Sequence, residues 1–150
     1  MTLREMILED FDQVLQIESD SFSDPWSREG LFAFWSMKNT LFFSVEQGGE
    51  ILGYCGLQYV LDEADVLSIA VRRDRRREGI GHFLLDGAMR IAREFGITKI
   101  HLEVRQGNEA AIRLYLRCGF VQDGLRKDYY SDPKEDAILM SACEENCGAV

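Results

Sequence analysis

Long apolar runs are missing from this sequence of 150 residues. No run approaches the roughly 18 apolar residues that a membrane-spanning helix requires, so the sequence predicts no transmembrane helix and no membrane partner. The opening stretch, MTLREMILED, has neither the basic flank nor the apolar centre of a secretion signal. We therefore expect a cytoplasmic protein.

Basic residues are also few relative to acidic ones. Lysines and arginines number 17 against 26 aspartates and glutamates, which gives a formal net charge of −9 at pH 7. A general nucleic-acid binder normally presents a basic surface, so this balance argues against nucleic acid as a partner. Net charge otherwise reports mainly on solubility and electrostatic steering.

Metal-ligating residues are sparse as well, with two histidines and four cysteines. Cys143 and Cys147 are four residues apart, but His82 and His101 lie far from them in sequence, and a structural zinc site takes four ligands. We expect no metal site, cysteines that remain thiols in the cytoplasm, and a flexible tail over residues 143–150.

Internal repeats, low-complexity segments and linkers are not found in the sequence either. The chain is 46% hydrophobic and 29% charged, a composition that suits one globular domain with a single core. The sequence therefore predicts one domain over residues 1–150.

Helical spacing of apolar residues predicts four helices. Ser27 and Asn108 can cap the second and the fourth, and Gly96 and Gly119 can end the third and the fourth. The residues expected to share one face of each helix are Phe11, Val14, Leu15 and Glu18; Leu31, Phe34 and Trp35; Ile80, Phe83, Leu84, Gly87, Ala88, Ile91, Ala92 and Phe95; and Ala111, Leu114, Tyr115 and Cys118.

Extended patterns lie between and after these helices. Gly48 and Gly49 separate two aliphatic and aromatic runs and can take positive φ, which predicts a hairpin. After an acidic turn, DEAD, the run VLSIAV predicts a fourth strand in which Leu67, Ile69 and Val71 alternate. The other strands are expected at residues 2–6, 97–105, 120–123 and 136–142. This order of elements predicts a mixed α/β or α+β sheet and not a doubly wound parallel one.

The stretch RRREGIGH, residues 75–82, joins the fourth strand to the third helix. A glycine-containing loop that opens a helix presents unpaired backbone N–H groups at the positive end of the helix dipole, which favours an anion. Gly79 and Gly81 have no side chain to keep a phosphate away, and five arginines among residues 72–77 can donate paired hydrogen bonds. A basic run is often only a solvated face, but the strand and helix around this one favour a phosphate site.

Neither common nucleotide motif fits this loop. The dinucleotide fingerprint G-x-G-x-x-G would need a glycine where Leu84 stands, and it follows the first strand of a parallel sheet. A nucleotide P-loop needs Gly-Lys followed by Ser or Thr, which is also missing.

The pattern Arg-x-x-Gly-x-Gly over residues 76–81 resembles the coenzyme-binding loop of the GNAT superfamily of acetyl-CoA dependent N-acetyltransferases. The stretches DPWS, LDEADVLSIAV, LEVRQGNEAAIRLYLRCGF and KDYYSDPKEDAILM look like the pattern of the ribosomal-protein-alanine N-acetyltransferases (RimI type) of that superfamily, in its order and spacing. The resemblance covers residues 2–142. It implies one α/β (α+β) domain of GNAT type, with a mixed central sheet, splayed fourth and fifth strands and flanking helices.

The same resemblance implies acetyl-CoA as a cosubstrate and no metal. It places Ile69, Ala70 and Val71 along the acetyl and pantetheine part of the coenzyme, and Asn108 at the pantetheine arm. The residues implied to line the pyrophosphate are Arg76, Arg77, Glu78, Gly79, Ile80, Gly81 and His82.

The implied reaction needs proton transfer, because a free α-amino group with a pKa of about 8 is mostly protonated at neutral pH and cannot attack a thioester. By the resemblance, Glu103 accepts that proton, directly or through water, and Tyr115 donates one to the departing thiolate. Backbone N–H groups at the splayed strands would polarise the thioester carbonyl. Without the resemblance, Glu103 would be interpreted as a solvated strand residue and Tyr115 as a core aromatic.

Two other side chains are less suited to catalysis. Cys118 as an acyl-carrying nucleophile would need an activating base, and no histidine is patterned beside it. His82 is interpreted as a helix-start residue near phosphate and not as a base.

The resemblance implies acetylation of the N-terminal alanine of small-subunit ribosomal protein eighteen, with Trp26, Tyr129 and Tyr130 bordering the acceptor's entrance. A broader protein N-terminal or small-amine acetyltransferase would share every catalytic residue. A coenzyme-binding regulatory module without turnover is a third possibility, which the presence of both Glu103 and Tyr115 disfavours. Nothing in the sequence indicates an oligomeric state.

Overall fold

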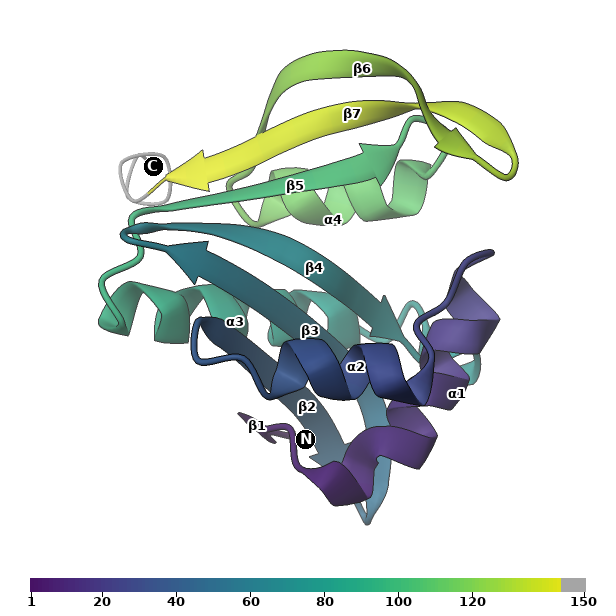
Figure 1. The fold of residues 1–150 in the computed structure, drawn as a ribbon, viewed down its shortest axis with the longest axis vertical. Coiled ribbons are helices and arrows are strands. Elements are labelled where there is room, and N and C mark those ends of the chain that lie inside the picture. The colour runs from purple at the N-terminus through teal and green to yellow at the C-terminus, as the bar shows by residue number, and fades with distance from the viewer. Residues whose placement is uncertain (144–150) are drawn as a thin grey trace.

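Seven strands form one mixed sheet within residues 1–143, the part of the chain that the computed structural model describes (Figure 1). The strand order is β1-β2-β3-β4-β5-β7-β6, and every neighbouring pair is antiparallel except β4 and β5, which are parallel. The strands are β1 (Thr2–Glu5), β2 (Thr40–Gln47), β3 (Glu50–Val60), β4 (Glu63–Val71), β5 (Lys99–Arg105), β6 (Val121–Ser131) and β7 (Lys134–Cys143).

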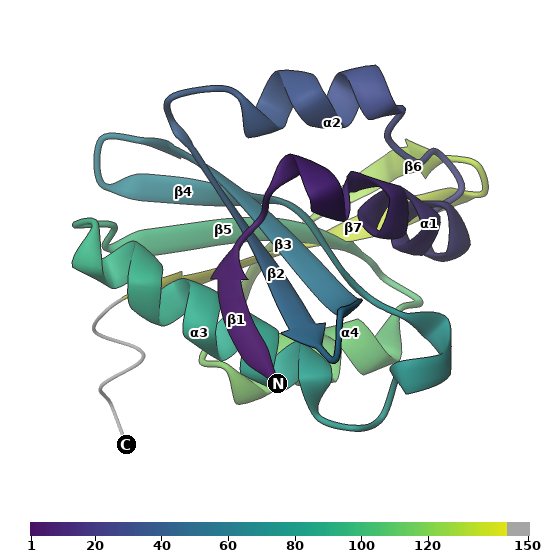
Figure 2. The same cartoon turned by 90° about the horizontal axis from the view of Figure 1, so that it is seen from below.

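Helices cover both faces of this sheet, as Figure 2 shows. One face carries α1 (Phe11–Ser21) and α2 (Arg28–Trp35), and the other carries α3 (Ile80–Glu94) and α4 (Glu109–Arg117). Two short 3₁₀ turns complete the elements, η1 (Leu8–Asp10) before α1 and η2 (Arg73–Arg75) after β4. No helix of residues 1–143 has the length and apolar character needed to cross a membrane. The expected mixed sheet with flanking helices is confirmed.

The helix boundaries follow from local signals in the sequence. The Ser27 hydroxyl caps α2 by accepting the Gly30 N–H at 3.0 Å, and the Asn108 side chain caps α4 at 3.2 Å. Gly96 and Gly119 follow α3 and α4 with φ of 89° and 95°, a left-handed conformation that glycine adopts without a Cβ clash. The predicted caps and stops are therefore confirmed.

The hydrophobic core lies on both sides of the sheet. The α3 and α4 face buries Leu84, Ala88 and Ala92 of α3, and the α1 and α2 face buries Phe11 and Val14 of α1. The predicted α3 stripe is wrong at its edges, because Phe83 and Phe95 are 36% and 60% exposed. Phe95 is the residue at which α3 ends, so its ring no longer points along the buried face.

Strand β4 differs from its prediction in two ways. It begins at Glu63, so Glu63 and Asp65 belong to the strand and not to the preceding turn. The predicted alternation is also wrong at Leu67, which packs on the α1 and α2 side, whereas Ile69 and Val71 pack on the α3 and α4 side. A bulge causes this change of face, because Leu57 of β3 pairs with Val66 and Gly56 pairs with Ser68, which leaves Leu67 as an extra residue.

The last two strands are longer than predicted. Strand β6 runs to Ser131 and β7 begins at Lys134, and Phe120 precedes β6 and is buried. Most β6 side chains are exposed and polar, so the apolar alternation that marks a strand is missing from them. Cys143 pairs with Lys99 at the end of β7 and so does not belong to a tail. The rest of the predicted tail, with Cys147, lies outside the described residues.

Candidate active site

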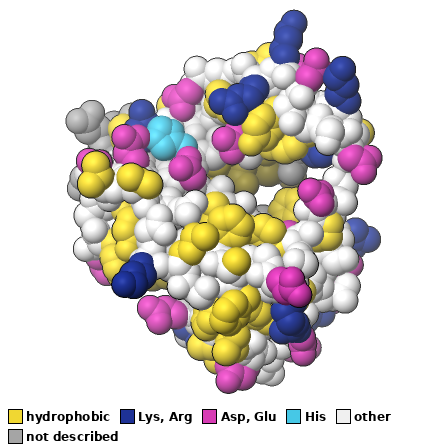
Figure 3. Space-filling view, viewed as in Figure 1, with side chains coloured by type: hydrophobic (Ala, Val, Ile, Leu, Met, Phe, Trp, Pro, Cys, Tyr) yellow, Lys and Arg dark blue, Asp and Glu magenta, His cyan; other side chains and the backbone are white. Residues whose placement is uncertain are grey.

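Strands β4 and β5 separate after a short parallel contact. Their ladder joins only Glu63–Asp65 to Lys99–His101, while β4 continues beside β3 to Val71 and β5 continues beside β7 to Arg105. Figure 1 shows the two strands diverging, and Figure 3 shows a hollow in the surface between the two halves of the sheet. We call this hollow the cleft.

The β4 side of the cleft is an unpaired strand edge. Beyond Asp65 no ladder pair joins β4 to β5 in the described residues. Along Ile69, Ala70 and Val71, the backbone groups that face β5 therefore meet no partner strand and are available to an extended ligand, except that the Val71 carbonyl accepts the Arg76 guanidinium at 3.2 Å. These are the three residues for which a pantetheine contact is predicted.

The turn between β4 and α3 presents free N–H groups. Gly79 precedes α3 with φ of 82°, and Arg77 also has a positive φ of 68°. Within residues 1–143, the backbone N–H groups of Ile80, Gly81 and His82 donate to no acceptor, and the next one, of Phe83, bonds the Gly79 carbonyl at 3.1 Å. Three unpaired N–H groups at the start of a 15-residue helix suit a phosphate oxygen.

Four of the five arginines around this turn already have partners in the protein. Arg77 is the one whose guanidinium has no partner among residues 1–143, and it is exposed. The partners of the others are Asp74 and Glu50 for Arg72, the Asp20 carbonyl for Arg73, Glu78 and Gln47 for Arg75, and the Val71 carbonyl with the Ser21 hydroxyl for Arg76. The basic run therefore offers a phosphate far fewer free hydrogen-bond donors than its sequence indicates.

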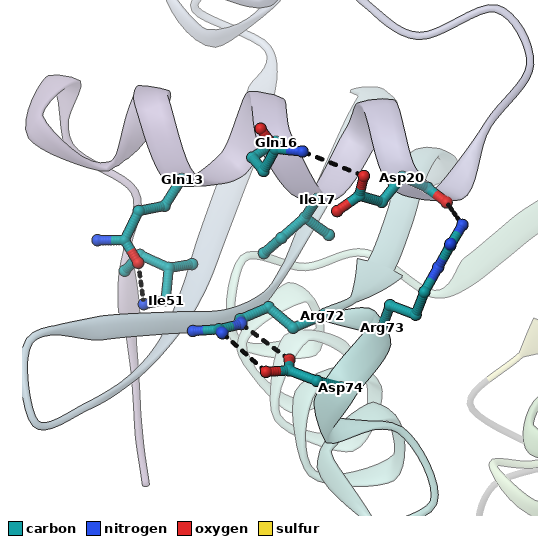
Figure 4. A pocket seen from close by; sticks show the side chains of 8 residues that line it. All are labelled: Gln13, Gln16, Ile17, Asp20, Ile51, Arg72, Arg73 and Asp74. Carbon is teal, nitrogen blue, oxygen red and sulfur yellow. Dashed lines mark hydrogen bonds and ion pairs between the residues drawn. The ribbon is translucent and has the colours of Figure 1, made fainter.

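Arg72 and Arg73 also face a pocket distinct from the cleft (Figure 4). This pocket of about 440 Å³ lies between α1, the start of β3 and η2, and Asp20 and Asp74 share its lining with the two arginines. Both arginines bond residues that line this pocket: the Arg73 guanidinium donates to the Asp20 carbonyl at 2.7 Å, and Arg72 bonds Asp74.

Glu103 and Tyr115, the two predicted proton-transfer residues, lie on different elements. Glu103 is exposed on β5, between the buried Leu102 and Val104. Tyr115 of α4 is only 7% exposed, and its ring packs against Phe120 with centroids 5.8 Å apart. Burial raises the pKa of Tyr115 above its ordinary value, so the phenol stays protonated and remains a proton donor.

The Tyr115 hydroxyl has no hydrogen-bond partner among the described residues. Every fully buried side-chain nitrogen or oxygen of these residues does have a partner. The hydroxyl of Tyr115 must therefore reach the molecular surface, where a ligand can meet it.

Tyr130 of β6 lies within electrostatic reach of both residues. Burial, followed by the negative charge of Glu103, raises the pKa of Tyr130 to about 12, and Tyr130 in turn contributes to the raised pKa of Tyr115. The Arg105 guanidinium lies 4.3 Å from the centre of the Tyr130 ring. Tyr129 packs edge-on against Tyr130 at 5.0 Å and is 44% exposed. Tyr130 thus lies near Glu103. That Tyr129 and Tyr130 border the acceptor's entrance stays a prediction.

The turn between β6 and β7 is bound by β5 and by the segment between α1 and α2. Arg105 donates to the Asp132 and Pro133 carbonyls at 3.2 and 2.8 Å and forms an ion pair with Glu135 at 3.2 Å. From the other side, the Ser23 hydroxyl donates to the Asp132 carbonyl at 2.7 Å. The segment between α1 and α2 therefore meets the β6–β7 turn (Figures 1 and 2).

Asn108 and Glu18 complete the comparison with the sequence. The oxygen of the Asn108 side chain caps α4, which leaves its amide group for a ligand.

Glu18 is expected from the sequence only as one position of an apolar helical face, yet it is a buried carboxylate with three hydrogen-bond donors around it. An acidic residue in the middle of an apolar stripe is the signal that would have indicated its importance.

A helix-covered sheet that splays open between two parallel strands, beside a glycine turn with free N–H groups, defines an acetyltransferase of the GNAT class. The sequence model of the Acetyltransferase (GNAT) family matches residues 11–120, and the chain belongs to this family of acyltransferases.

Known proteins with the same architecture are named N-acetyltransferases. The chain is 36% identical over 142 residues to the [Ribosomal protein bS18]-alanine N-acetyltransferase of Escherichia coli K12. This alignment covers 93% of the chain described in this article and 95% of the Escherichia coli enzyme. The crystal structure of the ribosomal-protein-S18-alanine N-acetyltransferase from Escherichia coli superposes with a TM-score of 0.87 at 33% identity, covering 95% and 92% of the two chains. Ard1 from Thermoplasma volcanium superposes with a TM-score of 0.84 at 29% identity, covering 95% and 96%. The expected family resemblance is confirmed, and the protein is an N-acetyltransferase.

Proposed function

We propose that this protein transfers an acetyl group from acetyl-CoA to the α-amino group of the N-terminal alanine of ribosomal protein bS18, in the cytoplasm. The observation that carries the reaction is the cleft, which has an unpaired strand edge on one side. We expect the exposed carboxylate of Glu103 and the neutral phenol of Tyr115 to border it. The acceptor is supported by similarity over nearly the full length of an enzyme that bears this name.

The coenzyme fits the residues around the cleft. The N–H groups of Ile80, Gly81 and His82 and the guanidinium of Arg77 would hold the pyrophosphate. Arg76 and Glu78 shape that turn through their bonds to Val71 and Arg75. The open edge at residues 69–71 would hold the pantetheine by backbone hydrogen bonds, with the Asn108 amide beside it. When bound, acetyl-CoA supplies an activated thioester.

The chain's own residues move the protons. Glu103 takes a proton from the acceptor ammonium, directly or through water, and so frees the nitrogen lone pair to attack the carbonyl carbon. The new C–N bond forms as the C–S bond breaks, and the Tyr115 hydroxyl gives its proton to the sulfur. Because Tyr115 is buried and its pKa is raised, it is protonated when that step begins. The nitrogen still carries one extra proton after the attack, and it returns that proton through water to the Tyr115 phenolate, which leaves a neutral amide.

A panel of acceptors tests the substrate. A peptide that begins Ala-Arg should be acetylated on its α-amine far faster than the same peptide with a blocked terminus and an internal lysine, or than spermidine. Mass spectrometry locates the acetyl group. Acetyl-lysine, or equal rates on spermidine and peptide, would overturn the bS18 acceptor in favour of a broader amine acetyltransferase.

Two substitutions test the proton transfers. Glu103→Gln and Tyr115→Phe should each lower kcat by roughly 100-fold or more while coenzyme affinity changes little, because both groups act only along the reaction path. Calorimetry measures the affinity, and Tyr59→Phe in β3 is the matched control for Tyr115→Phe. Coenzyme binding without turnover in the unsubstituted protein, on any amine, would instead favour a regulatory module.

A further inference from the structure

Glu18 is a carboxylate buried without a cation. It lies near the end of α1, is 3% exposed, and forms no ion pair with any residue of the described chain. Removing a carboxylate from water without a countercharge is costly, so hydrogen bonds must offset that cost. Neither proton-transfer step of the proposed reaction uses Glu18, so the burial of a carboxylate at this position needs another explanation.

Three donors from three different elements satisfy this carboxylate. Oε1 accepts the hydroxyls of Tyr54 in β3 and Ser68 in β4, the latter at 2.8 Å. Oε2 accepts the backbone N–H of Trp26, in the segment between α1 and α2, at 2.9 Å. Burial, followed by the negative charge of Glu18, raises the pKa of Tyr54, which keeps that hydroxyl a donor.

One of these donors lies beside the bulge in β4, on the stretch of the strand that no longer pairs with β5. Ser68 directly follows Leu67, and both face α1 because of the bulge. The unpaired strand edge begins just after Asp65 and continues through Ser68 and the next residue, Ile69. Glu18 therefore holds β4 at the point where it departs from regular pairing.

The second donor, Trp26, lies in the segment between α1 and α2, which the family resemblance predicts to border the acceptor's entrance. The Trp26 ring stacks on Phe34 at 5.5 Å and lies 6.0 Å from Phe42. Three residues earlier, the Ser23 hydroxyl bonds the Asp132 carbonyl of the β6–β7 turn. Residues 22–27 are thus held at two points. The Trp26 N–H bonds Glu18 of α1, and the Ser23 hydroxyl bonds Asp132 of the β6–β7 turn.

We propose that Glu18 is a positioning residue for the acceptor: its carboxylate fixes the Trp26 segment relative to the Ser68 bulge, and so sets the spacing between the wall that meets the incoming chain terminus and the strand edge that presents the acetyl group. The inference rests on the proposed acetyl transfer and goes beyond it. A displacement of the Trp26 segment moves the amine out of a near-attack distance of about 3 to 3.5 Å. The pyrophosphate turn follows the same end of β4 that carries Ser68, but Glu18 bonds none of its residues, so its free N–H groups should change little.

The main test replaces the carboxylate while keeping its volume. Glu18→Met removes all three hydrogen bonds, and we expect the KM for the acceptor peptide to rise at least about 10-fold while the KM for acetyl-CoA stays within about threefold. Glu18→Gln should retain most of the acceptor affinity, because its oxygen can accept the Trp26 N–H while its amide group donates to the two hydroxyls.

Two further variants separate positioning from general stability. Asp10→Asn alters another buried carboxylate, at the opposite end of α1 and far from the cleft, and should destabilise the protein without changing the acceptor KM. Ser23→Ala removes an exposed hydroxyl, so this variant should fold even if Glu18→Met does not. It should also raise the acceptor KM, because it releases the same segment from the Asp132 carbonyl.

Hydrogen exchange gives a readout that does not depend on turnover. The Trp26 amide should exchange slowly in the unsubstituted protein and in Asp10→Asn, and fast in Glu18→Met. An unchanged acceptor KM in folded Glu18→Met and in Ser23→Ala, or an equal rise of both KM values, would overturn the inference. If the unsubstituted protein acetylates no peptide, the proposed function is wrong. In that case the exchange measurement remains informative, because slow exchange at the Trp26 amide in Glu18→Met would show that Glu18 does not anchor this segment.

Discussion

Asp10 shows how a single buried carboxylate can be kept charged. It is 4% exposed and accepts hydrogen bonds from the Arg4 guanidinium at 2.8 and 2.9 Å, the Ile7 N–H at 3.0 Å and the Ser44 hydroxyl at 3.0 Å. Burial opposes the charge and is the largest single influence on its pKa. The Arg4 and backbone hydrogen bonds together outweigh burial, so the pKa of Asp10 lies below its ordinary value.

This lowered pKa predicts a pH-dependent stability. A carboxyl with a folded-state pKa below the unfolded value of 3.8 contributes stability above that pH and loses it as the pH falls through the folded pKa. Asp10→Asn should cost about 1–3 kcal/mol at pH 7, because it leaves the Arg4 guanidinium without its buried partner. Urea unfolding at several pH values measures the effect. The difference between the two proteins should shrink from pH 6 to pH 3, and a constant difference would contradict the assignment.

Gly56 is required by a close approach beneath the bulge. A Cβ at this position would lie 2.4 Å from a ring carbon of Phe42, which itself packs against Trp26. Gly56→Ala should therefore destabilise the protein by about 1–3 kcal/mol through overpacking. Gly124→Ala in β6 is the matched control, since its Cβ would meet Leu139 at an ordinary 3.9 Å. Thermal unfolding of both variants decides the matter, and equal stability would show that Phe42 moves aside freely.

At the scale of elements, the β4–α3 turn predicts that one arginine matters more than its neighbours. Arg77→Ala should weaken coenzyme A binding by roughly 10-fold or more, the loss expected for a charge-assisted hydrogen bond of about 1.5–3 kcal/mol. Arg75→Ala removes the same charge from the same turn, but Glu78 holds that guanidinium at 3.1 Å, so its effect should be small. Calorimetry with coenzyme A compares the two. Equal weakening would mean that long-range charge, and not a direct contact, attracts the phosphates.

At the scale of the whole molecule, the sheet is two half-sheets joined by a short parallel ladder. β1 to β4 form one half and β5 to β7 the other, and within residues 1–143 only Glu63–Asp65 and Lys99–His101 pair between them. A ligand seated in the cleft contacts both halves and binds only the folded state, so it should stabilise the whole domain.

Coenzyme A at 100 times its dissociation constant should stabilise the protein by about 2.7 kcal/mol, which raises the Tm by about 5–10 °C for a chain of this length. Calorimetric melting measures the shift, and hydrogen exchange should locate the added protection in β4 and β5. At the same coenzyme concentration, Arg77→Ala should show a smaller shift. A shift without protection of either strand would place the ligand elsewhere.

The helices, their caps, the Gly48–Gly49 hairpin and the glycine turn before α3 were determined by the sequence alone. Their causes are local: an apolar period of 3.6 residues, a capping side chain, or a glycine at positive φ acts within a few residues of the chain. The same is true of β5, where apolar and polar residues alternate in the sequence and Leu102 and Val104 are buried while Glu103 is exposed.

Only the tertiary structure decided which of these groups have partners. The bulge at Leu67 depends on how β3 and β4 pair, and four arginines of the basic run are held by groups such as Asp20 and Ser21, more than 50 residues earlier. Glu18 meets Ser68 across 50 residues of sequence, a contact that no local period encodes. Hydrogen-bond partners are chosen by whichever donors the folded sheet brings within reach, so the pattern of residue types located the cleft but could not indicate which side chains remain free to act in it.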